Sequence, residues 1–346
     1  MHTPRGYTHR RILLCSIVSR HPAYAMTAHP RSRLMTLLCW LPIVTTNVVA
    51  LGCLDARAQE TPSTAPLHVA LEIDRALPAL GEPVYATVRL KNVGDAPIDV
   101  PKVLDPQLGD VRIVVSSAER PRFLYLPLFL TDAVQTTAKL EPGEEMAATF
   151  PIFYGALGWT FPKPSTYRIS ATIRSTGLPA RSYSDPVSLR VAEGDGTSAA
   201  LFRETQAGEE AAKFLLWQRG DHLHDGQALL AAILETHPDS HLADFVRAAF
   251  GHNFSRDFRN YSVGRVRPAD CETALGYLRH VRADRLPSYL RVQKELDEAR
   301  CLAYQSRMEE AEAAVQTARD EAGGRPEYRQ LFRQAIRLQP SLSSLP

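Results

Sequence analysis

The sequence lacks the short motifs that mark common catalytic and nucleotide-binding sites. It contains no Gly-x-Ser-x-Gly, Ser-x-x-Lys, Gly-x-x-x-x-Gly-Lys, Gly-x-Gly-x-x-Gly or His-Glu-x-x-His. Hydrolases with a nucleophile elbow, P-loop enzymes, dinucleotide-binding enzymes and zinc proteases of the usual pattern are therefore not indicated. We expect no cofactor and no metal site and name no catalytic residue, although a triad built from scattered loops would leave no such motif.

Cysteine and positive charge are also scarce once the first 58 residues are set aside. Three of the five cysteines, Cys15, Cys39 and Cys53, lie in or before an apolar leader, so Cys271 and Cys301 are the pair that clearly remains. Residues 1–58 hold seven of the 40 basic and one of the 38 acidic residues, which leaves 33 basic and 37 acidic residues and a net charge of about −4. The basic footprint of a nucleic-acid-binding protein is absent.

The most informative feature that is present is an export signal. Arg31 and Arg33 precede an uncharged segment, residues 34–54, and Ala56-Arg57-Ala58 follows it. A positive start, an apolar middle and a small-x-small end are typical of a secretory signal peptide. We therefore predict a leader over residues 1–58, a Pro/Ser/Thr-rich linker over 59–66, and a mature protein in the periplasm or outside the cell.

Two other interpretations of the leader stay open. The segment Val49-Ala50-Leu51-Gly52-Cys53 resembles the lipobox of bacterial lipoproteins, and lipidation of Cys53 would tether the protein to the envelope. An uncleaved leader of about 20 apolar residues would span a bilayer. A membrane partner is therefore expected only through a lipid anchor or a retained leader. Met26 or Met35 would be a more ordinary start for such a signal.

Residues 67–192 show the two-residue period of β-strands. Val69, Leu71 and Ile73 alternate with polar neighbours, and similar alternation returns over residues 84–91, 111–115, 167–173 and 187–191. Gly, Pro and Asn turns separate these short runs. The pattern predicts a half-buried antiparallel β-sandwich.

Several phrases of this region resemble the immunoglobulin-like modules of bacterial surface proteins. They are Gly81-Glu82-Pro83-Val84, the Val-x-Leu-x-Asn of residues 88–92, the Leu-x-Pro-Gly-Glu of residues 140–144 and the Tyr-x-Ile-x-Ala of residues 167–171. The resemblance implies that Tyr167 anchors a corner of the sandwich. No Cys–Trp–Cys framework is present, so an antibody-type disulfide is excluded. The resemblance implies a fold and no activity.

From residue 197 to residue 340 the apolar residues recur at helical spacing, which predicts an α-helical domain. Pro238-Asp239-Ser240 is a good helix start, and Pro268 and Pro287 open further helices. A helix over residues 308–322 should end at Gly323-Gly324.

Short helices joined by short turns indicate stacked antiparallel helix pairs. Ala299, Ala311, Val315 and Ala318 fall at the spacing of small and apolar positions in a tetratricopeptide repeat, and residues 292–326 resemble one such repeat. Its signature Trp and Gly positions are missing, so an irregular helical bundle is the alternative. The predicted fold class is an N-terminal immunoglobulin-like antiparallel β-sandwich followed by a tetratricopeptide-like α-helical domain.

Cys271 and Cys301 are predicted to form a disulfide. They lie near the start of one expected helix and near the end of the next, so antiparallel packing would bring them to similar heights. In an exported protein such a bridge would persist. Two buried free thiols are the alternative.

Two segments are candidates for contact with a partner. The connection from Phe254 to Arg267 interleaves arginines with aromatic residues, a composition typical of binding hot spots. Its candidate residues are Arg256, Phe258, Arg259, Tyr261, Arg265 and Arg267. The uncharged run Phe123–Leu130 is either a packed strand and loop or a hydrophobic patch that docks, for instance onto the helical half.

We therefore expect an exported envelope protein that binds a protein partner without catalysis, with the sandwich positioning a helical half whose concave face binds that partner. The alternatives are an extracytoplasmic hydrolase with a scattered site, or an inhibitor or ligand-binding module that acts through loops of the sandwich. A concave apolar groove would favour binding, and a pocket with convergent carboxylate, His or Ser groups would favour catalysis.

Overall fold

The computed structural model describes residues 66–75, 77–131, 136–174, 182–194, 196, 201–202, 205–261 and 263–344. The predicted leader, Cys53 and all of the predicted linker except Pro66 lie outside these ranges. The strands and helices belong to one compact unit, Thr61–Pro346. Within the described ranges, no helix combines the length and the apolar character needed to cross a membrane.

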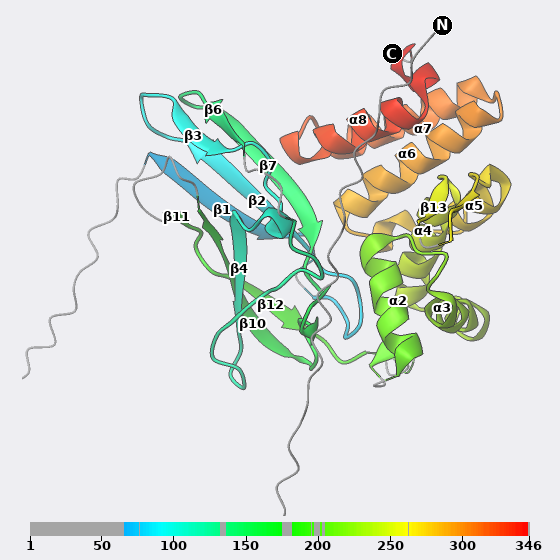
Figure 1. Ribbon diagram of the computed structural model, residues 1–346, viewed down its shortest axis with the longest axis horizontal. Helices are drawn as coiled ribbons and strands as arrows, with labels where there is room; N and C mark the ends of the chain where they lie inside the picture. The colour runs from blue at the N-terminus through cyan, green and yellow to red at the C-terminus, as the bar shows by residue number, and fades with distance from the viewer. Residues whose placement is uncertain are drawn as a thin grey trace, which may run out of the picture. The chain divides into compact units, whose positions relative to one another are not determined.

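The N-terminal region is an antiparallel β-sandwich, as predicted (Figure 1). One sheet has the order β1-β2-β7, with strands β1 (Leu67–Ile73), β2 (Tyr85–Asn92) and β7 (Glu145–Pro151). The other has the order β11-β10-β4-β5, with β12 also paired to β10; its strands are β4 (Val111–Ser116), β5 (Phe123–Leu124), β10 (Ser165–Ile173), β11 (Ser182–Tyr183) and β12 (Val187–Val191).

Two small antiparallel pairs and one short helix complete the sandwich. They are β3 (Ile98–Pro101) with β6 (Thr137–Leu140), β8 (Tyr154–Gly155) with β9 (Gly158–Trp159), and the 3-10 helix η1 (Pro106–Leu108). The core between the two larger sheets is filled by alternate residues such as Val88, Leu90, Ile113 and Ile169, each fully buried. The two-residue period therefore indicated the inward face correctly.

Tyr167 forms the corner contact that the resemblance implied. Its hydroxyl donates to the carbonyl oxygen of Lys163, four residues upstream, at 2.8 Å. The ring is buried and packs edge-on against Phe161. The contact fixes the entry into β10, the strand that joins β4 to β11 and β12.

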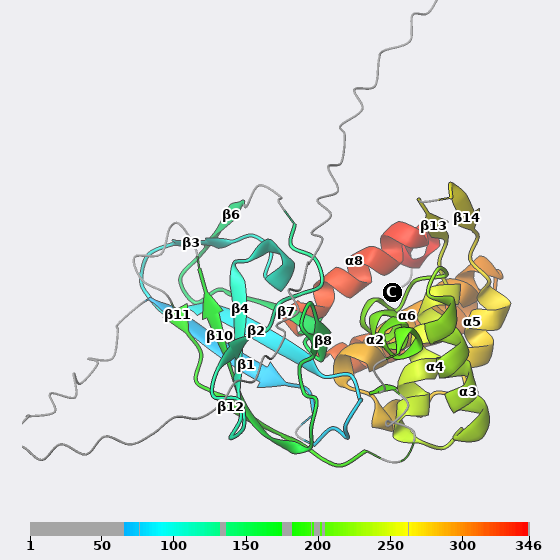
Figure 2. The same cartoon turned by 60° about the horizontal axis from the view of Figure 1, so that its bottom comes forward.

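The C-terminal region contains seven described α-helices (Figure 1, Figure 2). They are α2 (Gln206–Trp217), α3 (His224–Thr236), α4 (His241–Phe254), α5 (Cys271–Leu278), α6 (Ser288–Tyr304), α7 (Met308–Ala322) and α8 (Arg329–Leu338). The short 3-10 helices are η2 (Ala283–Arg285), η3 (Pro326–Tyr328) and η4 (Pro340–Ser344). Consecutive helices pack in pairs, α2 with α3, α4 with α5 and α6 with α7.

Local sequence signals set several helix ends as predicted. The Ser240 hydroxyl accepts a hydrogen bond from the backbone N–H of Ala243 at 3.2 Å and caps α4. Gly323 ends α7 with φ of 55°, a left-handed conformation that glycine adopts without steric cost.

One expectation needs revision: the first half of β2 is buried on both faces. The predicted sandwich has an outer face in water, but Tyr85 is 3% exposed and Thr87 also 3% exposed on that face. Tyr85 stacks on Tyr289 of α6 with ring centroids 5.5 Å apart, and β7 contacts η3. The helical region therefore covers the outer face of this sheet at the start of β2 and along β7, and one apolar core runs from the sheets into α2, α3 and α4.

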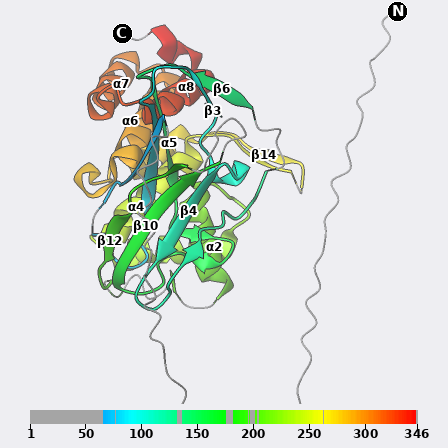
Figure 3. The same ribbon diagram turned by 90° about the vertical axis from the view of Figure 1, so that its left-hand side faces the viewer.

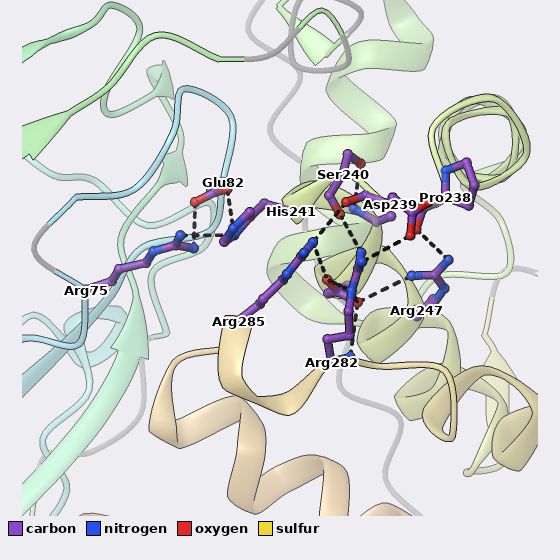
Figure 4. A network of polar contacts seen from close by, with 11 residues as sticks. Arg75, Glu82, Pro238, Asp239, Ser240, His241, Arg247, Arg282 and Arg285 are labelled. Carbon is purple, nitrogen blue, oxygen red and sulfur yellow. Dashed lines mark hydrogen bonds and ion pairs between the residues drawn. The ribbon is translucent and has the colours of Figure 1, made fainter.

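Ion pairs continue this junction on the side of α4 (Figure 4). Glu82, which follows β1, lies 2.8 Å from Nη1 of Arg75 and 3.7 Å from Nδ1 of His241, the first residue of α4. One turn further along α4, buried Asp244 forms ion pairs with Arg247, Arg282 and Arg285. These groups fix the start of α4 to the sandwich and to η2.

Candidate functional site

The predicted loop between α4 and α5 is a β-hairpin. Strands β13 (Phe258–Asn260) and β14 (Arg265–Arg267) pair in antiparallel register, and Gly264 turns the chain with φ of 63°. The hairpin projects from the helical region (Figure 2, Figure 3). The composition of this segment was visible in the sequence, but its hairpin geometry was not, because the strands are only three residues long.

Arginines hold the base of the hairpin. Arg267 donates from Nε to Oδ2 of Asp221 at 2.6 Å and from Nη2 to the carbonyl oxygen of Asn253 at 2.9 Å. Arg256 donates from Nη2 to Oδ1 of Asp297 at 3.2 Å, and its side chain is 11% exposed. Phe258 packs its ring against His222 at 6.1 Å. These three candidate residues, Arg256, Phe258 and Arg267, face the protein itself.

The other three candidates lie on the free surface of the hairpin. Arg259, Tyr261 and Arg265 are exposed, and Tyr261 is 84% exposed. Val263 and Val266 are exposed beside them. We call these five residues the hairpin tip. The Arg259 guanidinium lies 5.9 Å from the centroid of the Tyr261 ring.

The two-residue period of the hairpin explains part of this division. Phe258 pairs with Arg267, and the next pair along, Arg259 with Val266, points to the opposite face. A composition argument treats all four arginines alike, whereas strand register separates Arg259 from Arg267. Arg265 lies on the same side of the hairpin as Arg267 but next to the turn, where it is exposed. The hairpin tip is therefore the part of the predicted surface that can reach another molecule.

A buried ionic cluster lies under the hairpin base. Asp297 of α6 lies 2.6 Å from Nδ1 of His252 and 3.6 Å from Nη2 of Arg300, in addition to its bond with Arg256. Burial, with help from Arg256, lowers the pKa of His252 to about 4. Burial alone would raise the pKa of Asp297, but His252 and Arg256 beside it hold that pKa well below its usual range.

The His252–Asp297 pair is oriented as in a catalytic triad, but it is buried, so a substrate has no access to it. With a neutral ring, His252 donates its Nδ1–H to Asp297, and both side chains are at most 10% exposed. The neighbouring Ser255 hydroxyl donates to the backbone oxygen of His252 at 2.9 Å rather than to the ring. The pair thus orients the end of α4, from which the hairpin begins. No group of three or more metal-ligating side chains occurs in the described part of the chain.

Cys271 and Cys301 lie together in the core of the last four helices. Cys271 is the first residue of α5, Cys301 lies in the last turn of α6, and both are buried free thiols. A hydrogen bond between them lowers the pKa of the Cys271 thiol and raises that of Cys301. The structure thus brings together the two residues of the predicted disulfide, and the bridge itself stays a prediction.

A second feature is an aromatic groove of about 400 Å³ between the sandwich and the helices. Its walls include Tyr125, Phe129, Phe150, Trp217 and Tyr289. Phe129, 59% exposed, stacks on Trp217 of α2 with ring centroids 5.5 Å apart. The apolar run of residues 123–130 therefore contributes to both parts of the protein. Tyr125 is buried in the core of the sandwich, while Phe129 contacts the helical region through Trp217.

Comparisons with known proteins identify no family. No family model matches the sequence, and no curated protein matches it. Structural likenesses are distant and concern β domains. Spo0M, a sporulation control protein of Bacillus subtilis, matches with 16% identity over 39% of this chain and 53% of that chain, at a TM-score of 0.26. The CARDB domain of a Pyrococcus furiosus protein in complex with di-metal ions matches with 16% identity over 37% of this chain and 94% of that chain, at a TM-score of 0.22.

A β-glucosidase from Erythrobacter marinus gives a similar result, with 18% identity over 37% of this chain and a TM-score of 0.24. The match covers 16% of that enzyme and 53% of Spo0M, so the chain corresponds to part of each. At these TM-scores the likenesses carry no argument about function.

Proposed function

We propose that this protein is an exported, non-catalytic binding protein of the cell envelope that holds a protein partner through the hairpin tip. One observation carries the proposal: Tyr261, 84% exposed, stands between two exposed arginines on a hairpin whose base is fixed by the ion pairs Arg256–Asp297 and Arg267–Asp221. Tyrosine and arginine dominate the energy of protein interfaces. A hairpin that is already ordered loses little conformational freedom when it binds.

The hairpin is a better candidate than the inner face of the helices. In repeat proteins a partner often lies along one face of the stacked helices. Here Tyr85 of β2 stacks on Tyr289 of α6 and Arg89 binds Glu327 of η3, so the protein's own sheet occupies part of the helical surface. The proposed role is therefore a rigid sandwich and helix body that presents the hairpin.

The place of action is part of the proposal. The predicted leader would carry the protein across the inner membrane, with cleavage after Ala58 or lipidation of Cys53. Cell fractionation with N-terminal sequencing tests this point. A mature chain that starts at Gln59 or at a lipid-modified Cys53 in the envelope fraction supports it, and a cytosolic chain that keeps residues 1–58 contradicts it.

Site-specific photo-crosslinking tests the hairpin. A photoreactive phenylalanine analogue is placed at Tyr261 and, as a matched control, at Tyr304, which is 66% exposed on α6. In native envelopes, we expect a discrete crosslinked partner from position 261 and none from position 304. Identical crosslink patterns from both positions would contradict a specific site.

Charge reversal gives the second test of the same site. The double variant Arg259→Glu with Arg265→Glu should abolish the crosslink. It removes the two guanidinium groups that would bond to the partner and puts carboxylates, which the same partner groups would repel, in their place. The matched control, Arg329→Glu with Arg337→Glu, makes the same charge change at exposed residues of α8. A crosslink that survives the hairpin variant unchanged would remove the hairpin tip from the proposal.

A second candidate function, binding of an apolar ligand, is favoured by the aromatic groove. Its volume of about 400 Å³ and aromatic walls resemble those of small-molecule sites. Saturable quenching of Trp217 fluorescence by an aromatic ligand such as anilinonaphthalene sulfonate, lost in Phe129→Ala, would support it. Quenching that is equal in wild type and Phe129→Ala would exclude the groove.

A further inference from the structure

A second cavity lies on the sandwich, on the side of the five-stranded sheet. It has a volume of about 270 Å³, and three of its eight lining residues are arginines, Arg112, Arg122 and Arg174. Phe123 and Tyr183 contribute aromatic walls. We call this cavity the arginine cleft. It shares no lining residue with the aromatic groove or with the hairpin tip.

Strand register brings these residues together from distant parts of the chain. Arg112 of β4 lies opposite Thr172 of β10, and Thr172 lies opposite Tyr183 of β11. Arg174 follows the end of β10, and Arg122 immediately precedes β5, the neighbour of β4. Arg112 and Arg174 lie at one end of the β4–β10 pair, and Arg122, opposite the other end of β4, lines the same cavity from a third chain segment.

The charges of the cleft are not balanced by the protein. No Asp or Glu lines the cleft. Within the described ranges, no salt bridge joins Arg112, Arg122 or Arg174 to a carboxylate, whereas Arg75 and Arg89 of the same sandwich are both paired.

Two charged neighbours lie beside the cleft. Asp110 is close enough to Arg174 for the guanidinium to lower its pKa, against the larger, raising effect of burial. Arg120 adds a cation, because its guanidinium carbon lies 3.7 Å from the centroid of the Phe123 ring. With one acid close to one arginine, the cleft keeps a positive excess that suits a multiply charged anion.

From this arrangement we infer that the arginine cleft binds a phosphate monoester. A monoester dianion has two negative charges and three free oxygens, so it matches three guanidinium groups better than a carboxylate does. Phe123 and Tyr183 give the organic group of the ester an apolar surface. The ester is either a soluble metabolite or the headgroup of a lipid, and both present the same chemistry to the arginines.

Titration calorimetry with phenyl phosphate tests the inference on the mature protein. Phenol and benzoate are the neutral and singly charged controls. We expect saturable binding of phenyl phosphate that weakens with added salt, and binding of benzoate that is at least about tenfold weaker. Absence of saturable binding at millimolar phenyl phosphate, or equal binding of phenol, would overturn the inference.

Variants locate the site. Arg122→Gln and Arg174→Gln change exposed residues and should each weaken phenyl phosphate binding about tenfold. Arg190→Gln, an exposed change on β12 of the same sheet, should leave binding unchanged. Equal affinities in all three variants would overturn the assignment to this cleft. A thermal melt without ligand confirms that each variant is folded.

Vesicle sedimentation distinguishes the two sources of the ester. Phosphatidylcholine vesicles doped with phosphatidic acid carry the monoester on a lipid, and pure phosphatidylcholine vesicles are the control. Binding to the doped vesicles that is lost in Arg122→Gln supports a lipid headgroup. Binding of phenyl phosphate without vesicle binding supports a soluble ester.

Discussion

Nη2 of Arg89 donates to Oε1 of Glu327 at 2.6 Å and thereby joins β2 to η3 across 238 positions of the chain. The Glu327 side chain is 1% exposed, and Arg89 also binds Glu72 and Glu145 at 3.1 Å each. This pair, with the Tyr85–Tyr289 stack, links the sandwich to the last helices.

Loss of Arg89 should destabilise this junction. Arg89→Leu leaves the buried Glu327 carboxylate with only Arg325, 3.9 Å away, as a cation, and we expect the free energy of unfolding to fall by about 3 kcal/mol. Urea denaturation measures the change. The double variant with Glu327→Gln should recover part of the loss, because the poorly compensated buried charge is then removed. The exposed pair Lys163–Glu119 is the control, and Lys163→Ala should leave the free energy of unfolding nearly unchanged. Equal losses in the two single variants would contradict a special role for Arg89.

Two helical glycines should respond in opposite directions to alanine. At Gly226 of α3, a Cβ atom would lie 2.4 Å from the backbone nitrogen of Ala211 in α2, so Gly226→Ala should separate the helices and cost about 2 kcal/mol. At Gly276 of α5 nothing lies within 4 Å, so Gly276→Ala should stabilise by about 0.5–1 kcal/mol through helix propensity. Thermal melts of both variants provide the comparison, and stabilisation by Gly226→Ala would show that α2 and α3 are not in close contact.

The cysteine pair should be oxidised in protein taken from an oxidising compartment. Cys271 and Cys301 already lie in hydrogen-bonding contact, so bridging needs little movement. Closing a loop of this length should stabilise by about 3 kcal/mol. Peptide mapping by mass spectrometry should find the linked peptides without reductant, and a reductant should lower the melting temperature of wild type but not of Cys301→Ala. Two free thiols in the native protein would refute the bridge.

Stability should fall between about pH 6.5 and pH 4 because of His252. Its pKa is about 4 in the folded protein and about 6.5 in an unfolded chain. In this window the unfolded state binds a proton that the folded state does not, so acidification favours unfolding, by an amount on the order of 3 kcal/mol. The stability that depends on the lowered pKa of His252 is fully present above pH 6.5.

The variant His252→Gln should show a flatter dependence of stability on pH in that window. His241, whose pKa is also lowered, first by burial and then by Arg75, contributes in the same direction, so His241→Gln is the comparison. Urea denaturation at several pH values measures both slopes. A slope that is unchanged in His252→Gln would show that this ring is not protonated differently in the two states.

The features of the fold that the sequence predicted are those set by local chemistry. Alternating apolar residues such as Ile113 and Val115 faced the core, the Ser240 cap began α4, and Gly323 ended α7. Pro127 placed the run of residues 123–130 away from a central strand, and β5 is indeed the last strand in its sheet order. Each of these signals acts over a few residues, so residues that are neighbours in the sequence are enough to predict the local structure.

The candidate sites were predicted less well, because they depend on register. Of the six hairpin candidates, Arg259, Tyr261 and Arg265 are exposed near the turn, while Arg256, Phe258 and Arg267 hold the base. The arginine cleft was missed. The outward position of Arg112 in an alternating strand was the available signal, but its meeting with Arg122 and Arg174 needs the pairing of three segments.

By itself, the sequence determined where most strands and helices form, which faces are apolar, and the order of a β region before an α region, because backbone propensity and side-chain period are local. Only the tertiary structure decided that residues 258–267 form a hairpin, that helices cover the outer face of β2 at Tyr85, and that Gly226 must stay small while Gly276 need not. Those outcomes depend on which surfaces meet, and segments such as β2 and η3, far apart in the chain, meet only when it folds.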